Sequence, residues 1–402
     1  MRPFLVTLSL LACALVVMAC GSQTAAPVSA PTVAAAATTV AGVAPTVAAA
    51  AAPALTAAAP TVAAAATSVA GVAPTVAAAV GTTVAGAAPT VAAKVTEVAK
   101  TTTRGKTRLS IATGGTGGVY YPYGGGLAQL ISKNIPNVDA AAEVTPASVD
   151  NMKLIQSGRA DLAFALADTV YDAFEGRGPF KDTGKVPVRA LAVLYSNYMH
   201  IIATEESGIK TVADLKGKRV SMGAAGSGTE IKGNRVLEAA GLNPDTDIQR
   251  ERLGVAESAA AMKDRKIDAF FWDGGLPTAA VLDLAATPNQ KIRFIPSGDA
   301  IAKMNDKYGP FYVKLTIPKG TYQGQDTDVD VAGTANILAV NENFDAQLAY
   351  DILKMMVDKQ SDVAAIHAEA RRFGLPQATV GSPVPFHPGA VKFYAEKGIT
   401  VK

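Results

Sequence analysis

The chain has 402 residues, which is enough for two or three units of ordinary domain size. From residue 107 onward it carries 32 basic and 33 acidic residues, a balance that argues against a nucleic-acid binder, which usually needs a basic face. Both cysteines, Cys13 and Cys20, lie within the first twenty residues, and the three histidines are far apart in sequence. We therefore expect no disulfide, no metal site, no cofactor and no catalytic triad in the remainder.

The first residues, 1–19, have the features of a targeting segment. Arg2 precedes an almost wholly apolar run, 4–17, which has the length of a signal-peptide core and is short for a membrane-spanning helix. The run ends in Ala19-Cys20, which resembles a bacterial lipobox and implies cleavage before Cys20 and lipidation of that cysteine. Ordinary signal cleavage beside an incidental cysteine is the alternative. We expect an extracytoplasmic protein, lipid-anchored to a bacterial membrane at the cell surface or in the periplasm.

Residues 20–106 form a low-complexity segment rich in Ala, Thr, Val and Pro. Pro-Thr-Val recurs at residues 31, 45, 60, 74 and 89, and 31–59 and 60–88 form a duplicated 29-residue unit. Alanine favours helix, whereas Thr, Val and Gly disfavour it, so a partly helical stalk and a disordered spacer are both compatible with this composition. In either case, the segment holds the folded part away from the membrane and carries no chemistry.

From residue 107, strand and helix patterns alternate. Strands are predicted at 108–112, 140–144, 162–167, 189–195, 219–223, 269–272, 292–296 and 336–340. Helices are predicted at 119–134, 148–158, 212–217, 230–240, 257–265, 278–286 and 344–359. Continuous apolar strands between helices indicate an α/β fold with mostly parallel sheets. Because 296 residues exceed what one compact core usually serves, we expect two α/β lobes.

Glycine and hydroxyl residues gather where predicted strands pass into helices. Ligands of open α/β sheets bind beyond the carboxyl ends of the strands, and helix starts offer free N–H groups that favour anions. Taken singly, each junction also has a structural explanation: Ser227 and Glu230 form a capping-box pattern, and Ser148 and Asp168 suit N-caps. The occurrence of five such junctions favours a binding site. They lie at 113–122, 145–151, 167–169, 223–230 and 272–277.

The same residues carry a resemblance to a known family. The run IATGGTGGVYYPYGGGL at 111–127 resembles the opening motif of the TAXI family, the solute-binding proteins of TRAP transporters. Further similar segments are ASVDNM (147–152), ADLAF (160–164), SGIKTVADLKGKRV (207–220), GSGTE (226–230) and IDAFF (267–271) before Gly274 and Gly275. The resemblance implies a type II periplasmic-binding fold with a cleft between two lobes and no enzymatic activity. It also implies delivery of an organic anion, such as glutamate or 2-oxoglutarate, to a permease driven by an ion gradient.

The implied fold sets the expected lobe boundaries and site. One lobe would comprise 107–205 and 332–402 and the other 206–331, with crossing segments at 200–204 and 337–341. A ligand carboxylate would sit between the junctions at 116–120 and 227–229, held mainly by backbone N–H groups because neither contains Arg or Lys. Tyr121 and Trp272 would form apolar walls. The predicted ligand-binding residues are Thr116, Gly117, Gly118, Tyr120, Tyr121, Ser148, Asn151, Asp168, Ser227, Gly228, Thr229, Trp272, Gly274 and Gly275.

Two other classes of protein remain open at this stage. An enzyme would need a nucleophile–base set, and none is visible in the sequence. A membrane-anchored sensor or surface adhesin would use the same fold without a permease. The leading prediction is a monomeric solute-binding lipoprotein whose partners are a small organic anion and a TRAP-type permease, with no nucleic acid bound.

Overall fold

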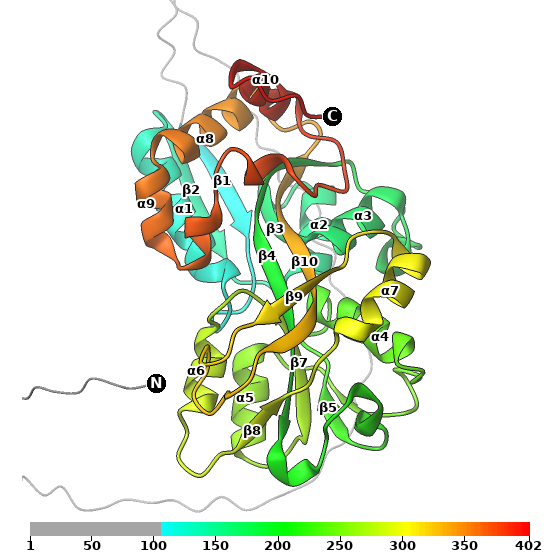
Figure 1. Ribbon diagram of the computed structural model, residues 1–402. Helices are drawn as coiled ribbons and strands as arrows, with labels where there is room; N and C mark the ends of the chain where they lie inside the picture. Colours follow the sequence, from blue (N-terminus) through cyan, green and yellow to red (C-terminus); the bar gives the residue numbers. More distant parts are fainter. Residues whose placement is uncertain (1–105) are drawn as a thin grey trace, which may run out of the picture. The chain divides into compact units, whose positions relative to one another are not determined.

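The computed structural model describes residues 106–402 (Figure 1). The predicted signal peptide, Cys20 and the 29-residue repeat lie outside these residues. Within 106–402, no helix is both long and apolar enough to cross a membrane.

Lobe 1, as we use the name, begins with strands and helices that alternate along the chain. Its first elements are β1 (Thr107–Ala112), α1 (Tyr120–Asn134), β2 (Val138–Glu143), α2 (Ser148–Gln156), β3 (Leu162–Leu166), α3 (Ala167–Glu175) and η1 (Gly178–Phe180). The chain returns to this lobe at its end, with α8 (Ala346–Asp358), α9 (Gln360–Ile366), η5 (Glu369–Arg372), η6 (Gln377–Thr379) and α10 (Pro388–Glu396). Burial explains why these segments form a strand or a helix: all five residues of the apolar strand β3 are buried, and the helix α8 buries its apolar face.

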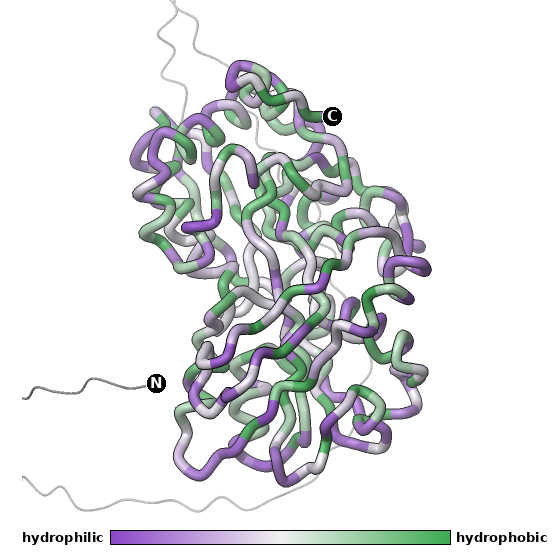
Figure 2. The backbone as a smooth tube through the Cα atoms, viewed as in Figure 1, coloured by the Kyte–Doolittle hydropathy of each residue, from purple (hydrophilic) through white to green (hydrophobic). Residues whose placement is uncertain are grey.

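Lobe 2 repeats the alternation. Its elements are η2 (Glu205–Ser207), η3 (Val212–Leu215), β5 (Arg219–Ser221), α4 (Gly228–Ala239), β6 (Gln249–Glu251), α5 (Val255–Lys263), β7 (Ala269–Gly274), α6 (Ala279–Ala285), β8 (Ile292–Phe294), η4 (Gly298–Ala300), α7 (Ile301–Tyr308) and β9 (Val313–Ile317). Hydrophobic stretches lie mainly inside each lobe, and hydrophilic stretches lie mainly on outer helices and loops (Figure 2).

Two long strands, β4 (Val188–Thr204) and β10 (Val329–Asn341), run through both lobes (Figure 1). The strand order is β2-β1-β3-β10-β4-β7-β5-β6, with β8 on β4 and β9 on β10. The predicted α/β fold is confirmed, but the expectation of mostly parallel sheets is wrong. In lobe 1, β1 pairs in parallel with β2 and β3, and in lobe 2, β5 pairs in parallel with β6 and β7. The strands β4 and β10 run antiparallel to each other and to the other strands they pair with.

The buried clusters locate the crossing. The core of lobe 1 takes Leu191–Tyr195 from β4 and Ile337–Val340 from β10, whereas the apolar residues of 198–203 and 329–332 belong to the cores of lobe 2. The strands therefore cross near 196–197 and 333–336, and not at 200–204 and 337–341 as the sequence suggested. The boundaries between the lobes therefore lie near 196–197 and 333–336, whereas the sequence analysis expected them at 205 and 332. The difference arises because the apolar pattern is continuous through the crossing and marks no boundary.

Candidate functional site

A cavity of about 380 Å³ lies between the two lobes, at the size expected of a site for a small molecule. Its walls are the loops that follow the parallel strands of both lobes, so the carboxyl ends of the two strand sets face each other across it. The lining residues are 114–120, 144–148, 223–224, 227–229, 254–257 and 272–274, with Leu166, Tyr195 and Asn197.

Three helices begin at this cavity. Neither α1, at Tyr120, nor α5, at Val255, has a side-chain cap. At α4, Ser227 Oγ accepts the Glu230 N–H at 3.1 Å, as the capping-box pattern predicts. This bond involves the third residue of the helix, and the N–H groups of the first two residues, Gly228 and Thr229, are not part of it. The first N–H groups of a helix have no partner within it and carry partial positive charge. The cavity thus presents three clusters of backbone donors suited to an anionic group.

Glycine at the junctions allows the lobes to approach each other. A Cβ placed on Gly118 of lobe 1 would lie 2.7 Å from Trp272 Cη2 of lobe 2, and one on Gly228 of lobe 2 would lie 2.7 Å from Ser148 Oγ of lobe 1. Beside these contacts, the Gly226 carbonyl accepts hydrogen bonds from the N–H groups of Val149 (3.1 Å) and Asp150 (3.2 Å). The lobes are therefore in contact around the cavity.

Ten of the fourteen predicted ligand-binding residues line this cavity. Their side chains or backbones come together from both lobes, although they span 159 positions of sequence. Trp272 contributes its ring, and its indole N–H is already donated to Thr278 Oγ1 at 2.8 Å. The ten are Thr116, Gly117, Gly118, Tyr120, Ser148, Ser227, Gly228, Thr229, Trp272 and Gly274.

Three of the other four predicted residues do not line the cavity and have other contacts. Tyr121 is not an apolar wall: it is 36% exposed, because α1 turns the buried Tyr120 and Tyr123 inward and Tyr121 outward. Asn151 is buried and donates to the carbonyls of Thr113 (2.7 Å) and Phe164 (2.8 Å), so it supports the wall without lining it. Gly275 lies against lobe 1, where a Cβ would be 3.0 Å from Tyr195 Cε2.

Asp168 is the fourth, and it takes part in an ion-pair cluster between the lobes. Its Oδ2 lies 3.1 Å from Nη1 of Arg235, which comes from α4, and accepts the Tyr312 hydroxyl at 2.8 Å. Arg235 Nη2 also pairs with Asp172. The N-terminal position of Asp168 in α3 suggested a ligand contact, but its Oδ2 is already satisfied by lobe 2, and its Oδ1 accepts the Thr169 N–H at 2.7 Å. Asp168 therefore links the lobes and is not part of the cavity wall.

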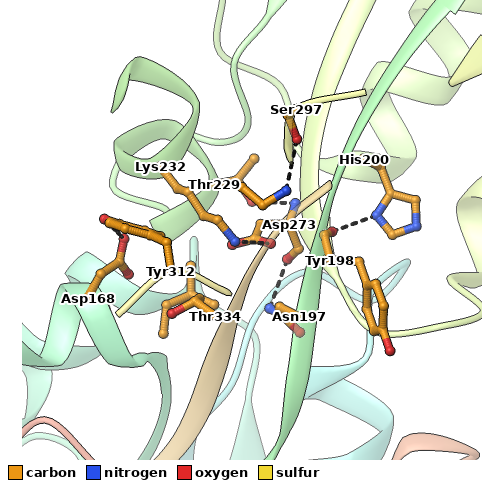
Figure 3. A network of polar contacts seen from close by, with 12 residues as sticks. Asp168, Asn197, Tyr198, His200, Thr229, Lys232, Asp273, Ser297, Tyr312 and Thr334 are labelled. Carbon is orange, nitrogen blue, oxygen red and sulfur yellow. Dashed lines mark hydrogen bonds and ion pairs between the residues drawn. The ribbon is translucent and has the colours of Figure 1, made fainter. Parts of the chain in front are cut away.

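Seventeen of the 27 lining residues were not among the predicted ligand-binding residues, and Asp273 is the most important of them. Its Oδ1 lies 3.1 Å from Lys232 Nζ, and both side chains are fully buried (Figure 3). Burial raises the pKa of Asp273 to about 6, with Lys232 opposing and Asp168 adding to the rise. Asn197 and Tyr195, on β4, also line the cavity. Asp273 was visible beside the glycine pair, but no sequence pattern distinguished Asn197 and Tyr195 within an apolar strand.

The shared strands and the cavity at facing strand ends define the fold of the type II periplasmic-binding proteins. The NMT1-like family model matches residues 111–398, and the chain belongs to this family.

Solved structures of binding proteins are also similar to the chain. The periplasmic aliphatic sulphonate binding protein SsuA of Escherichia coli is 17% identical with a TM-score of 0.39, over 72% of this chain and 90% of that chain. The alkanesulfonate-binding protein SsuA of Xanthomonas axonopodis pv. citri, bound to MOPS, is 17% identical with a TM-score of 0.39, over 73% of this chain and 91% of that chain. A putative L-cystine ABC transporter of Listeria monocytogenes is 13% identical with a TM-score of 0.38, over 64% of this chain and 93% of that chain.

The contact between Gly118 and Trp272 yields a test of the cavity as the binding site. We expect Gly118→Ala to raise the ligand dissociation constant at least about tenfold, because the added methyl group would overlap the Trp272 ring when the lobes are in contact. Gly125→Ala, in the helix α1 that begins two residues after Gly118, is the matched control: its Cβ would meet nothing within 4 Å, and we expect unchanged affinity. Titration calorimetry on both variants measures the difference. Equal affinity of Gly118→Ala and the wild type would place the ligand elsewhere.

Proposed function

We propose that the protein is an extracytoplasmic solute-binding protein that captures a small organic ligand carrying a carboxylate. The observation that carries the proposal is the convergence of α1, α4 and α5 on one interlobe cavity, which gives backbone donors from both lobes to a single anionic group. A ligand held in this way bridges the lobes and stabilises the arrangement in which they touch. No bond needs to be made or broken, and we propose no catalytic role.

A thermal-shift screen with mono- and dicarboxylates and amino acids, including glutamate and 2-oxoglutarate, tests the binding proposal. At a hundred times its dissociation constant, a ligand that binds only the folded protein stabilises it by about 2.7 kcal/mol. For a folded part of this size, we expect a rise in melting temperature of about 5 °C. No shift with any member of the panel would contradict the proposal and would favour an adhesin.

We further propose that the bound solute is delivered to a TRAP-type permease. Support comes from the TAXI-like motifs, of which 111–127 supplies the first half of α1 and the glycine loop before it. In membrane vesicles that contain the permease, we expect uptake of the labelled solute only when the protein and an ion gradient are both present. Uptake that needs ATP and no gradient would assign the protein to another transporter class. High-affinity binding without any uptake would favour a membrane-anchored sensor.

The lipid anchor is proposed on the Ala19-Cys20 pair after the apolar run. Cys20→Ser removes the thiol that would be acylated, so we expect the protein to leave the membrane fraction or to remain unprocessed. Cell fractionation and immunoblotting measure this, with Cys13→Ser as the control, because Cys13 lies within the predicted signal peptide. A processed Cys20→Ser protein that stays with the membrane would place the anchor elsewhere.

A further inference from the structure

The charges that line the cavity do not match those expected for a doubly anionic ligand. Of the residues within 106–402 that line it, two are charged, Glu257 and Asp273, and both are acidic; no Lys, Arg or His is among them. The nearest buried cation, Lys232, lies behind Asp273 and is neutralised by it. Among the groups that line the cavity, only the helix N-termini therefore favour negative charge.

Asp273 is held in place by lobe 2 and by the crossing strand. Its N–H donates to Thr229 Oγ1 at 3.2 Å, and its carbonyl accepts from Asn197 Nδ2 at 3.0 Å (Figure 3). Its Oδ1 is occupied by Lys232. These three bonds fix the backbone and one carboxylate oxygen, so the position of the other oxygen is fixed as well.

That other oxygen, Asp273 Oδ2, is buried and has no hydrogen-bond partner in the described part of the chain. The hydroxyl of Tyr195, which also lines the cavity, is likewise buried and without a partner there. A buried carboxylate oxygen without a donor costs free energy, and a carboxylate can only accept. The group that satisfies it must therefore donate, and a ligand ammonium group donates three hydrogen bonds and carries the complementary charge.

We propose that Asp273 determines the specificity of the cavity and selects a zwitterionic amino acid over the corresponding 2-oxo acid. The ligand carboxylate lies at the helix N-termini, and its ammonium group donates to Asp273 Oδ2. A 2-oxo acid presents a carbonyl oxygen at the same position, which would face the carboxylate with no donor between them. This inference rests on the proposed function, since it specifies the solute that the same cavity binds.

Matched ligand pairs test the inference on the full-length protein in detergent. The pairs are L-glutamate with 2-oxoglutarate, L-alanine with pyruvate, and L-leucine with 4-methyl-2-oxopentanoate, each measured by titration calorimetry. In any pair with a binding member, we expect the amino acid to bind at least tenfold more tightly. A 2-oxo acid that binds equally or more tightly would overturn the inference and leave the proposed function intact. Binding of no member, together with a negative thermal-shift screen, would overturn both.

A double variant assigns the preference to Asp273. Asp273→Asn alone leaves Lys232 buried without a counter-charge, so it is combined with Lys232→Met, which removes both charges and keeps similar side-chain sizes. We expect the amino-acid to 2-oxo-acid affinity ratio to fall at least tenfold in this variant. The control, Arg219→Met with Asp268→Asn, removes an ion pair of 2.6 Å in the same lobe whose residues do not line the cavity, and should keep the wild-type ratio. A wild-type ratio in the folded Lys232/Asp273 variant would also overturn the inference.

Discussion

The continuity of β4 and β10 is the constraint on which the rest of the structure depends. Because both strands pass through both lobes, the lobes can rotate against each other only by bending these strands near Asn197 and Asn336. Hydrogen bonds tie the crossing to the cavity: the Tyr120 hydroxyl donates to Asn336, Asn336 Nδ2 to Asn197 Oδ1 at 2.7 Å, and Asn197 Nδ2 to the Asp273 carbonyl. A helix start in lobe 1 is thus connected to a strand end in lobe 2 through the two segments that must move.

The lobes are joined on one side by charge and around the cavity by close packing. Arg235 of lobe 2 pairs with Asp168 and Asp172 of lobe 1, while Gly118 packs against Trp272. Such a buried cluster gains little net free energy over apolar packing, since taking the charges out of water offsets most of their attraction. Its geometric demands are strict, however, and they favour a single relative position of the lobes.

The sequence predicts this fold and site wherever local chemistry decides them. The glycine loop before Tyr120 and the cap at Ser227 are local features, and the structure places both at the cavity. Helices α3, α7, α9 and α10 and strands β6 and β9 were not predicted, and none of them is longer than nine residues. Asp168 was misplaced for a different reason: an N-terminal helical position shows that a carboxylate is favoured there, but not that Arg235 approaches it from 67 residues away. Asp273 and Lys232 needed the same three-dimensional information.

The buried pair of Lys232 and Asp273 explains how the cavity can accept a ligand of zero net charge. A free lysine or arginine would attract any anion, and the affinity would depend mainly on the charge of the solute. Here Lys232 is satisfied by Asp273 and presents no charge to the cavity, so attraction of the anionic end is left to fixed backbone N–H groups of α1, α4 and α5. Asp273 Oδ2 then adds a requirement for a donor at a fixed position. Recognition by two fixed and opposite partial charges depends on where the charges of the solute lie, and it discriminates among molecules that share a carboxylate.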